Sequence, residues 1–305
     1  MKMKQRLLII VGPTASGKSA LAVRLARKFN GEIISADSRQ VYKGLDIGTG
    51  KITKREMKGV PHHLLDVAPP KDPFSASDFK RQASGAIARI VDAGKLPIVV
   101  GGTGFYIDSL VGRIVLPDVV PNKILRARLS KKTAAQLFSM LKKRDPKRAA
   151  MLSTQSERNN KVRLIRALEV VRHQGPTLVL PRSDLGNSYN VLWIGVVPSD
   201  AQLRKNITAR LHARIRKGMV AEAKHLYTGG LTYRRMHELG LEYRSLARLL
   251  QKKITRAEME KELQSDIWRY ARKQIGYWKR NKEIKWFEPK NTPKIEKAVR
   301  SWLKS

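Results

Sequence analysis

The 305-residue chain contains no cysteine, which excludes disulfide bonds and thiolate metal sites and fits a reducing compartment. Long hydrophobic runs are also missing. Apolar stretches such as Leu7–Val11 and Leu96–Val100 are far shorter than the ~20 residues that a helix needs to cross a bilayer. The basic N-terminus continues directly into an apolar run, which argues against a signal peptide. We therefore expect a cytoplasmic protein that has no membrane partner.

Acidic residues are few. Lys and Arg number 62 against 25 Asp and Glu, so the formal net charge is +37 at pH 7. Repulsion among these charges opposes a compact fold. A polyanion relieves the repulsion, because Lys and Arg replace the counterions condensed on its phosphates. The charge therefore favours nucleic acid over an anionic membrane surface as the partner, with a generally basic proteome in the source lineage as an alternative contributor.

Apolar runs alternate with helical patterns in the first third of the chain. We expect strands at 6–11, 32–37 and within 95–104, and helices at 19–30 and 77–93. This alternation is typical of a parallel sheet covered by helices. In such a sheet, the loops at the carboxyl ends of the strands form the ligand site.

The middle of the chain is helical and basic. Residues 122–186 contain 16 Lys and Arg against four Asp and Glu, after which 189–197 resumes a strand-like pattern. We predict an α/β fold of the P-loop NTPase type with a helical insertion domain. The parallel-sheet core spans 1–117 and 187–305, and the insertion spans 118–186.

The part of the chain after residue 200 is largely helical. We expect one long helix or a pair of helices over 201–227, and a basic, aromatic helix followed by a short strand within 266–289.

The first strand and the first helix are joined by Gly12-x-x-x-x-Gly17-Lys18-Ser19, the pattern of a phosphate-binding loop. Its glycines let successive N–H groups converge on phosphate oxygens, Lys18 adds a charge, and the helix start adds its dipole. Ser19 can bind Mg²⁺. We predict that this loop binds a diphosphate or triphosphate through Gly12, Pro13, Thr14, Ala15, Ser16, Gly17, Lys18 and Ser19.

The residues alone do not identify the phosphate compound. A GTP-binding protein needs an Asn-Lys-x-Asp segment, and the sequence has none. Asp37, at the end of the second strand, is a candidate for the carboxylate that P-loop NTPases place near Mg²⁺. A kinase of a small metabolite therefore remains open on these grounds.

An ordered set of motifs carries a family resemblance. The motifs are GPTASGKS at 12–19, ISADSRQVYKGLDIGTGK at 34–51, PHHLLD at 61–66, GGTGFY at 101–106, RLIRALEV at 163–170 and YARKQIGYW at 270–278. With these motifs the chain resembles the tRNA dimethylallyltransferases, also called tRNA isopentenyltransferases, along nearly its whole length.

The resemblance implies transfer of a dimethylallyl group from dimethylallyl diphosphate to the N6 amine of an adenine. That adenine lies 3′ of the anticodon in tRNAs that read codons beginning with U, and diphosphate is the leaving group. It further implies Mg²⁺ as cofactor, the tRNA anticodon stem-loop as partner, tRNA binding by the insertion, and a monomer with no obligate protein partner. The rival hypotheses are the small-metabolite kinase and an RNA-binding protein that has lost catalysis.

The resemblance assigns the general base to Asp37, because adenine N6 is a poor nucleophile whose proton must be accepted as the C–N bond forms. The alternative role of Asp37 is to bind water on Mg²⁺. Thr103 is placed at the reacting centre, with capping of the next helix as its alternative. Lys18, Ser19 and Arg210 neutralise the departing diphosphate.

The chain departs from the family pattern at two positions. The family usually has Arg-Ile-x-x-Arg in the helix after the resumed strand, and here Asn206 takes the place of the first arginine while Arg210 keeps the second. Arg214, one helical turn from Arg210, is a candidate substitute. Gly50 stands where the family more often has Ala, and we expect this difference to cost little.

The predicted tRNA contacts combine the Asp37 motif with basic side chains, each of which has a solvated surface charge as its alternative. They are Asp37, Ser38, Arg39, Gln40, Arg126, Arg163, Arg166, the segment 238–243, Arg269, Arg272, Lys273 and Gln274. His62 and His63 are expected on a loop, where neighbouring histidines do not form a chelating face, so we predict no metal site there.

Overall fold

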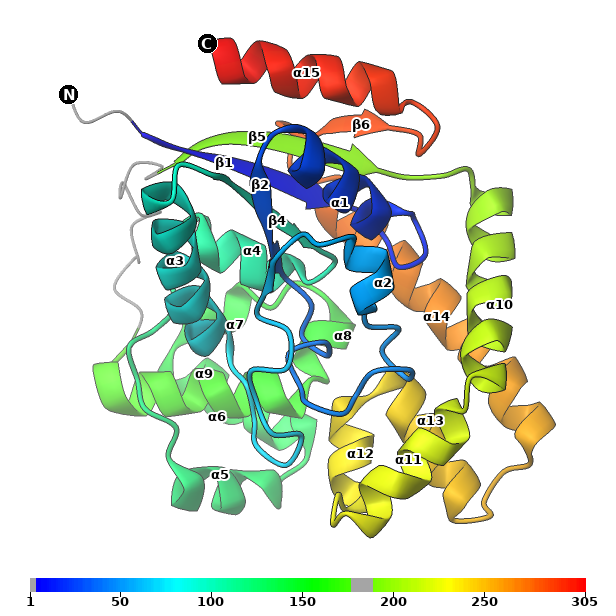
Figure 1. The fold of residues 1–305 in the computed structure, drawn as a ribbon. Helices are drawn as coiled ribbons and strands as arrows, with labels where there is room; N and C mark the ends of the chain where they lie inside the picture. The colour runs from blue at the N-terminus through cyan, green and yellow to red at the C-terminus, as the bar shows by residue number, and fades with distance from the viewer. Residues whose placement is uncertain (1–3, 177–188) are drawn as a thin grey trace. The chain divides into compact units, whose positions relative to one another are not determined.

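The computed structural model describes residues 4–176 and 189–305, and in this part of the chain six parallel strands form one sheet (Figure 1). The strand order is β3-β2-β4-β1-β5-β6. The strands are β1 (Gln5–Val11), β2 (Gly31–Ser35), β3 (His62–His63), β4 (Leu96–Gly101), β5 (Tyr189–Val196) and β6 (Lys285–Phe287).

Contacts among the described residues divide the chain into two compact units. One lies within Met1–Gly112 and Leu185–Ser305, and the other within Arg113–Asp184. The first unit contains the sheet together with α1 (Lys18–Lys28), α2 (Lys54–Met57), α3 (Ala76–Asp92), α4 (Gly104–Leu110), α10 (Asp200–Arg216), α11 (Met219–Thr228), α12 (Tyr233–Leu239), α13 (Leu241–Leu250), α14 (Arg256–Trp278) and α15 (Thr292–Lys304). Every helix in residues 4–176 and 189–305 is too short or too polar to cross a bilayer.

Strand β1 lies between β4 and β5, and its residues Leu7 to Val11 have no exposed surface. Leu7, Ile9 and Val11 pack against α3, α4 and the end of α14, whereas Leu8 and Ile10 pack against α1 and α15. A strand buried on both faces needs an apolar side chain at every position. This requirement explains the uninterrupted apolar run that precedes the phosphate-binding loop.

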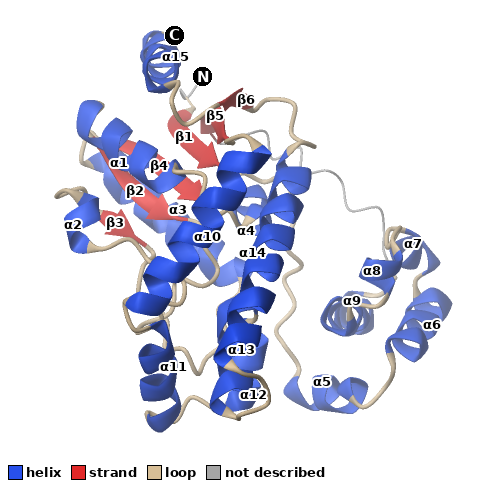
Figure 2. Cartoon of the chain, turned by 90° about the vertical axis from the view of Figure 1, so that its right-hand side faces the viewer, coloured by secondary structure: helices blue, strands red, loops and turns tan. Residues whose placement is uncertain are grey.

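A helical cluster built by α10 to α14 forms the remaining core of the first unit. Figure 2 shows α10 and α14 side by side, and their apolar faces pack together through residues such as Leu203, Ile207, Leu263 and Ile267. The segment that follows β2 enters this cluster through Val41 to Leu45. The loops at the carboxyl ends of the strands are thereby supported by helices from the C-terminal part of the chain.

The second unit is a bundle of short helices with its own core. Leu137, Leu141 and Leu164 are fully buried in it, so these helices pack as an independent layer. Its helices are α5 (Lys123–Ser130), α6 (Ala134–Arg144), α7 (Pro146–Ala150), α8 (Gln155–Arg158) and α9 (Lys161–Gln174). The predicted boundary between residues 186 and 187 lies outside the described residues.

The predicted α/β class with a helix-covered parallel sheet is confirmed, and most differences concern the ends of elements. The segment 201–227 forms a pair of helices, because Gly218 has φ 96° and interrupts the run between α10 and α11. Helix α14 begins ten residues before the predicted 266, where Thr255 and Glu258 form a capping box. The prediction of a loop at His62 and His63 is wrong, since these residues form β3 beside β2.

Glu169 joins α5 to α9 in the second unit. Its carboxylate is 2% exposed and accepts hydrogen bonds from the Asn122 N–H, from Arg126 and from Arg166. Burial alone would raise the pKa of Glu169, but these donors outweigh it and lower the pKa to about 2. The carboxylate is therefore ionised in the folded protein, and the stability it contributes is present above pH 4.5 and is lost as pH falls toward 2.

We predict that Glu169→Gln destabilises the second unit by roughly 1–3 kcal/mol, since a neutral amide with a single acceptor oxygen replaces the carboxylate that two arginines share. Hydrogen exchange measured by mass spectrometry should become faster in peptides from α5 and α9. The control is Glu157→Gln, which removes a carboxylate of the same unit that lies nearer the surface. Equal exchange rates in the two variants would contradict the role assigned to Glu169.

Candidate active site

Three neighbouring strands carry the motifs that the sequence identified. The phosphate-binding loop follows β1, the segment with Thr103 follows β4, and Asp37 follows β2. These loops border a cavity of about 330 Å³, whose walls include Thr14, Lys18, Ser19, Asp37, Ser38, Arg39, Gln40, Arg210 and Gln274. The cavity therefore lies at the carboxyl edge of the sheet, where open α/β folds bind ligands.

Lys18 is the first residue of α1, and its Nζ donates to the Pro13 carbonyl 3.0 Å away. Burial, followed by the neighbouring Arg210, lowers the pKa of Lys18 to about 8, while Asp37 acts in the opposite direction. Two cations are thus held close together beside a helix N-terminus. This arrangement stabilises a bound polyanion, because an anion relieves the repulsion between the cations.

The Asp37 side chain is held in a tight turn by backbone N–H groups of the residues that follow it. Its Oδ1 accepts the N–H groups of Arg39, at 2.8 Å, and Gln40, at 3.3 Å, and Oδ2 takes part in neither bond. The Oγ1 of Thr103 accepts the N–H of Ser38 at 3.1 Å. Thr103 directly precedes α4 at the N-cap position, but its side chain makes no capping hydrogen bond, so the alternative role proposed from the sequence does not describe it.

Arg210 reaches the site from α10 and is fixed by the loop after Tyr42. Its Nη2 donates to the Gly50 carbonyl at 2.7 Å. Gly50 has φ +60°, and a Cβ atom there would lie 2.4 Å from the same Nη2. Gly50 therefore leaves room for the end of the Arg210 side chain, and the expectation that this departure costs little stays a prediction.

Asn206, which replaces the first arginine of the family pattern, and Arg214, its candidate substitute, both bind protein backbone. Asn206 donates its Nδ2 to the Ala15 carbonyl at 3.1 Å, so it supports the phosphate-binding loop from outside. Arg214 is 8% exposed and donates through Nη1 to the Gly48 carbonyl, at 2.6 Å, and to Glu242, at 2.9 Å. We therefore assign Arg214 to the support of the loop that contains Gly48, and not to the replacement of the missing arginine.

Glu222 on α11 was not predicted from the sequence. Its carboxylate accepts the successive N–H groups of Asp46, Ile47 and Gly48 at 3.0, 2.6 and 2.9 Å, and the Tyr243 hydroxyl at 2.7 Å. Tyr243, which belongs to the predicted tRNA-contact segment 238–243, is 2% exposed and serves this support. The three N–H donors are more than 170 residues from Glu222, so no local pattern reveals these contacts.

Gln274 lines the cavity, and its predicted tRNA contact stays a prediction. It is 6% exposed, its Oε1 accepts the Thr14 N–H at 2.8 Å, and its Nε2 donates to the Gly102 carbonyl at 3.1 Å. Both ends of the amide thus bind protein backbone. The structure places Gln274 between two loops of the site and not on an outer surface.

The other predicted tRNA contacts fall into three places. Ser38, Arg39 and Gln40 line the cavity beside Asp37. On α14, Lys273 is exposed, Arg269 pairs with Asp266, and Arg272 pairs with Asp200 and lies near the ring of Trp268. In the second unit, Arg126 and Arg166 bind Glu169, and Arg163 binds Glu157.

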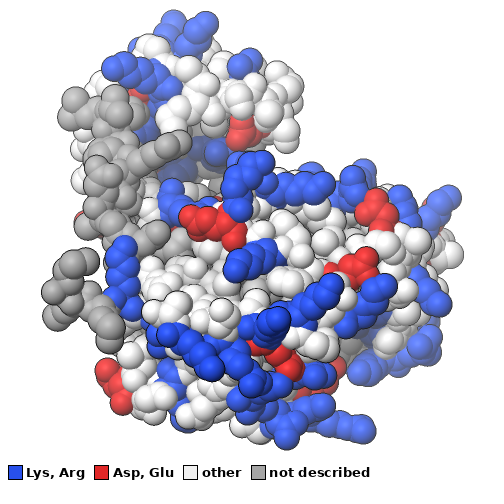
Figure 3. Space-filling model, turned by 90° about the horizontal axis from the view of Figure 1, so that it is seen from above, with Lys and Arg blue, Asp and Glu red and all other residues white. Residues whose placement is uncertain are grey.

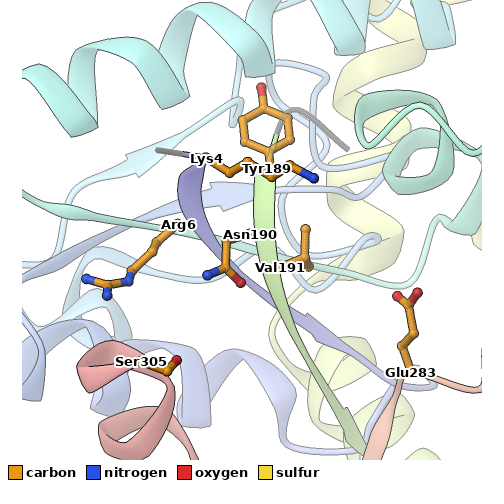
Figure 4. Close-up of a pocket in the computed structure, with 7 residues that line it drawn as sticks. All are labelled: Lys4, Arg6, Tyr189, Asn190, Val191, Glu283 and Ser305. Carbon is orange, nitrogen blue, oxygen red and sulfur yellow. The ribbon is translucent and has the colours of Figure 1, made fainter. Parts of the chain in front are cut away.

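Two further hollows border the first unit. One, of about 880 Å³, is lined by the phosphate-binding loop at 15–17 and shares Lys18, Ser19, Ile52 and Arg210 with the cavity. The other, of about 510 Å³, lies beside Lys4, Arg6 and Tyr189 at the amino ends of β1 and β5 (Figure 4). Ligands of open parallel sheets bind at the opposite, carboxyl edge, so the second hollow is not the candidate site.

The residues present fit Mg²⁺ bound with a diphosphate. Among the described residues, no group of three or more His, Asp or Glu side chains is arranged to hold a metal ion. Ser19 and Asp37 nevertheless supply hard oxygen atoms to one cavity, and Mg²⁺ typically combines one or two such ligands with phosphate oxygens and water. His63 pairs with Glu32, and His62 binds the Val60 carbonyl through Nδ1.

The excess of basic over acidic residues is visible on the surface. Figure 3 shows one face of the protein, on which Lys and Arg far outnumber Asp and Glu. Because such a surface attracts phosphates at long range, it is suited to an RNA backbone.

Comparisons with known proteins agree with these motifs. A family model described as IPP transferase matches residues 40–282. The tRNA dimethylallyltransferase of Carboxydothermus hydrogenoformans is 39% identical over 94% of this chain and 93% of the relative. That of Anoxybacillus flavithermus is 36% identical over 99% of this chain and 96% of the relative.

Solved structures are similar over the same length. The full-length tRNA isopentenylpyrophosphate transferase of Bacillus halodurans has a TM-score of 0.74 and 34% identity, with 99% of this chain and 97% of that chain covered. A eukaryotic dimethylallyltransferase acting on tRNA has a TM-score of 0.80 at 24% identity, covering 93% of this chain and 74% of that one, and shares the fold. We conclude that the protein belongs to the IPP transferase family.

Proposed function

We propose that this protein transfers a dimethylallyl group from dimethylallyl diphosphate to the N6 amine of the adenine 3′ of the anticodon, in tRNAs that read codons beginning with U. The products are N6-isopentenyladenine and diphosphate. The supporting observation is that Lys18 and Arg210 share one cavity with Asp37, next to Thr103, at the edge of three neighbouring strands. Such a cavity brings an anion-binding side and a proton-accepting side together.

The donor side of the proposed reaction rests on the phosphate-binding loop. Its N–H groups, Lys18 and Arg210 bind the diphosphate. As the bond between the allyl carbon and the diphosphate oxygen breaks, negative charge grows on the leaving group, and these fixed donors stabilise it. Mg²⁺, bound through Ser19 with Asp37 as an alternative ligand, supplies further charge neutralisation when it is present.

The acceptor side rests on Asp37 and Thr103. The turn fixes the Asp37 carboxylate, which accepts a proton from the N6 amine while nitrogen bonds to the allyl carbon. The Thr103 oxygen already accepts the Ser38 N–H, so its own O–H can donate to a phosphate oxygen or its second lone pair can accept from the amine. The adenine leaves its stack to enter the cavity, at a cost of a few kcal/mol.

RNA contacts offset that cost. Ser38, Arg39 and Gln40 at the cavity are the proposed contacts next to the everted base, and the basic helices of 118–186 together with Arg269, Arg272 and Lys273 are proposed to bind the anticodon stem-loop. We further propose that the protein acts as a monomer in the cytoplasm and needs no protein partner.

The direct test incubates the protein with anticodon stem-loop RNA and dimethylallyl diphosphate and analyses the nucleosides by mass spectrometry. Prenylated adenosine and released diphosphate are expected. Unmodified RNA from correctly folded protein would contradict the proposal. A parallel reaction with ATP and no RNA tests for a small-metabolite kinase, which would consume ATP.

Asp37→Asn should lower kcat by roughly 10²–10⁴-fold, because the amide cannot accept the amine proton. The amide oxygen can still accept the N–H groups of Arg39 and Gln40, so the turn and the affinity for the stem-loop should stay nearly unchanged. Asp92→Asn, at the exposed end of α3, is the matched control. An Asp37→Asn variant as active as this control would remove Asp37 from the mechanism.

Gly50→Ala should raise KM for dimethylallyl diphosphate roughly tenfold or more, because the new methyl group displaces Arg210 and weakens a charged hydrogen bond. Gly59→Ala is the matched control: Gly59 has a similarly positive φ of +79°, but no atom lies within 4 Å of its Cβ position. The steric explanation fails if both substitutions change KM equally.

The affinity for inorganic diphosphate should fall as pH rises through about 8. Lys18 is protonated below its pKa, which is lowered to about 8, and only the protonated form attracts the anion. Lys18→Arg keeps its charge over this range and should bind diphosphate with a flatter pH profile. Calorimetric titrations of both proteins over this pH range distinguish the titration of Lys18 from that of diphosphate itself, because diphosphate titrates equally in both experiments. Parallel pH profiles of the two proteins would refute the assignment of the change to Lys18.

A further inference from the structure

Helix α14 packs directly on the glycine-rich segment after β4. A Cβ atom at Gly102 would lie 2.0 Å from Gln274 Nε2, and one at Gly104 would lie 2.0 Å from the ring of Tyr277. Gln274 and Tyr277 are one helical turn apart on α14. Both glycines are therefore needed so that this helix can approach the loop, whatever the loop binds.

The Gln274 amide has a single possible orientation in this contact. The Thr14 N–H is a donor, so it must face Oε1, and the Gly102 carbonyl is an acceptor, so it must face Nε2. Gln274 is buried, which makes both bonds costly to lose: a backbone group left unpaired in such a place costs about 1–3 kcal/mol.

The two bonded loops belong to opposite sides of the reaction. Thr14 lies in the loop that holds the diphosphate. Gly102 precedes Thr103, whose hydroxyl accepts the N–H of Ser38 beside Asp37. One amide thus spans the donor side and the acceptor side of the cavity.

We propose that Gln274 is a positioning residue that fixes the spacing between the diphosphate loop and the Asp37–Thr103 pair. This inference rests on the proposed function. Because a misplacement of about 1 Å between reacting groups can cost a hundredfold in rate, the amide governs the chemical step. It does so through the two backbone groups that it binds, the Thr14 N–H and the Gly102 carbonyl.

Gln274→Glu tests this role through pH. The new carboxylate keeps an acceptor for the Thr14 N–H, but its second oxygen faces the Gly102 carbonyl oxygen, and these two acceptors repel each other. The repulsion changes the spacing between the loops, so kcat should fall about tenfold to a hundredfold. Protonation of the new carboxyl restores a donor, and the ratio of variant to wild-type kcat should recover as pH is lowered. Affinity for the stem-loop should stay within about twofold, whereas a direct RNA contact would weaken binding and leave kcat unchanged.

The matched control is Gln264→Glu on the same helix, whose amide donates to the Thr208 hydroxyl at the surface. This substitution should leave transfer unchanged. If Gln274→Glu behaves like the control, the positioning role is wrong. Absence of transfer by the wild-type protein would instead refute the proposed function.

A double-mutant cycle provides a second test. Gly102→Ala should slow transfer in the wild type, since its methyl group meets the Gln274 amide, and should slow it much less in a Gln274→Ala background that removes this amide. Independently of transfer, Gln274→Ala should speed hydrogen exchange in both peptides that cover 11–18 and 101–106. Additive rate effects, or exchange that changes in neither loop, would overturn the inference.

Discussion

The alignment of three parallel strands is the constraint on which the site depends. Strands β2, β4 and β1 are neighbours in the sheet and run in one direction, so their carboxyl ends meet at one edge. Asp37, Thr103 and the phosphate-binding loop follow these ends in turn. The full burial of β1 fixes the register of the central pair, and a slip by one residue would turn core side chains toward the opposite face.

Side chains from distant helices hold the loops of the site in place. Asn206 and Arg210 on α10, Glu222 on α11 and Gln274 on α14 each bind backbone groups of a loop. A polar side chain that binds backbone is specific in geometry and insensitive to the identity of the loop residue. The helical cluster thereby determines the shape of the cavity.

The sequence predicts the parts of the site that have local signals. The phosphate-binding loop, Asp37 and Thr103 stand where a strand pattern ends, and so could be located without a structure. Glu222, the bridge formed by Gln274 and the steric pairing of Gly50 with Arg210 could not, because each depends on a contact between residues far apart in the chain. For the same reason, the sequence of α14 does not distinguish an exposed polar residue such as Lys273 from a buried one such as Gln274.

The bridge from Thr14 to Gln274 spans 260 positions of the chain. Translation proceeds from the N-terminus, so a growing polypeptide carries every recognisable motif of its catalytic loops long before α14 leaves the ribosome. Until then the two loops lack the side chain that joins them. A product of premature termination before Gln274 would therefore retain the whole phosphate-binding signature without this bridge.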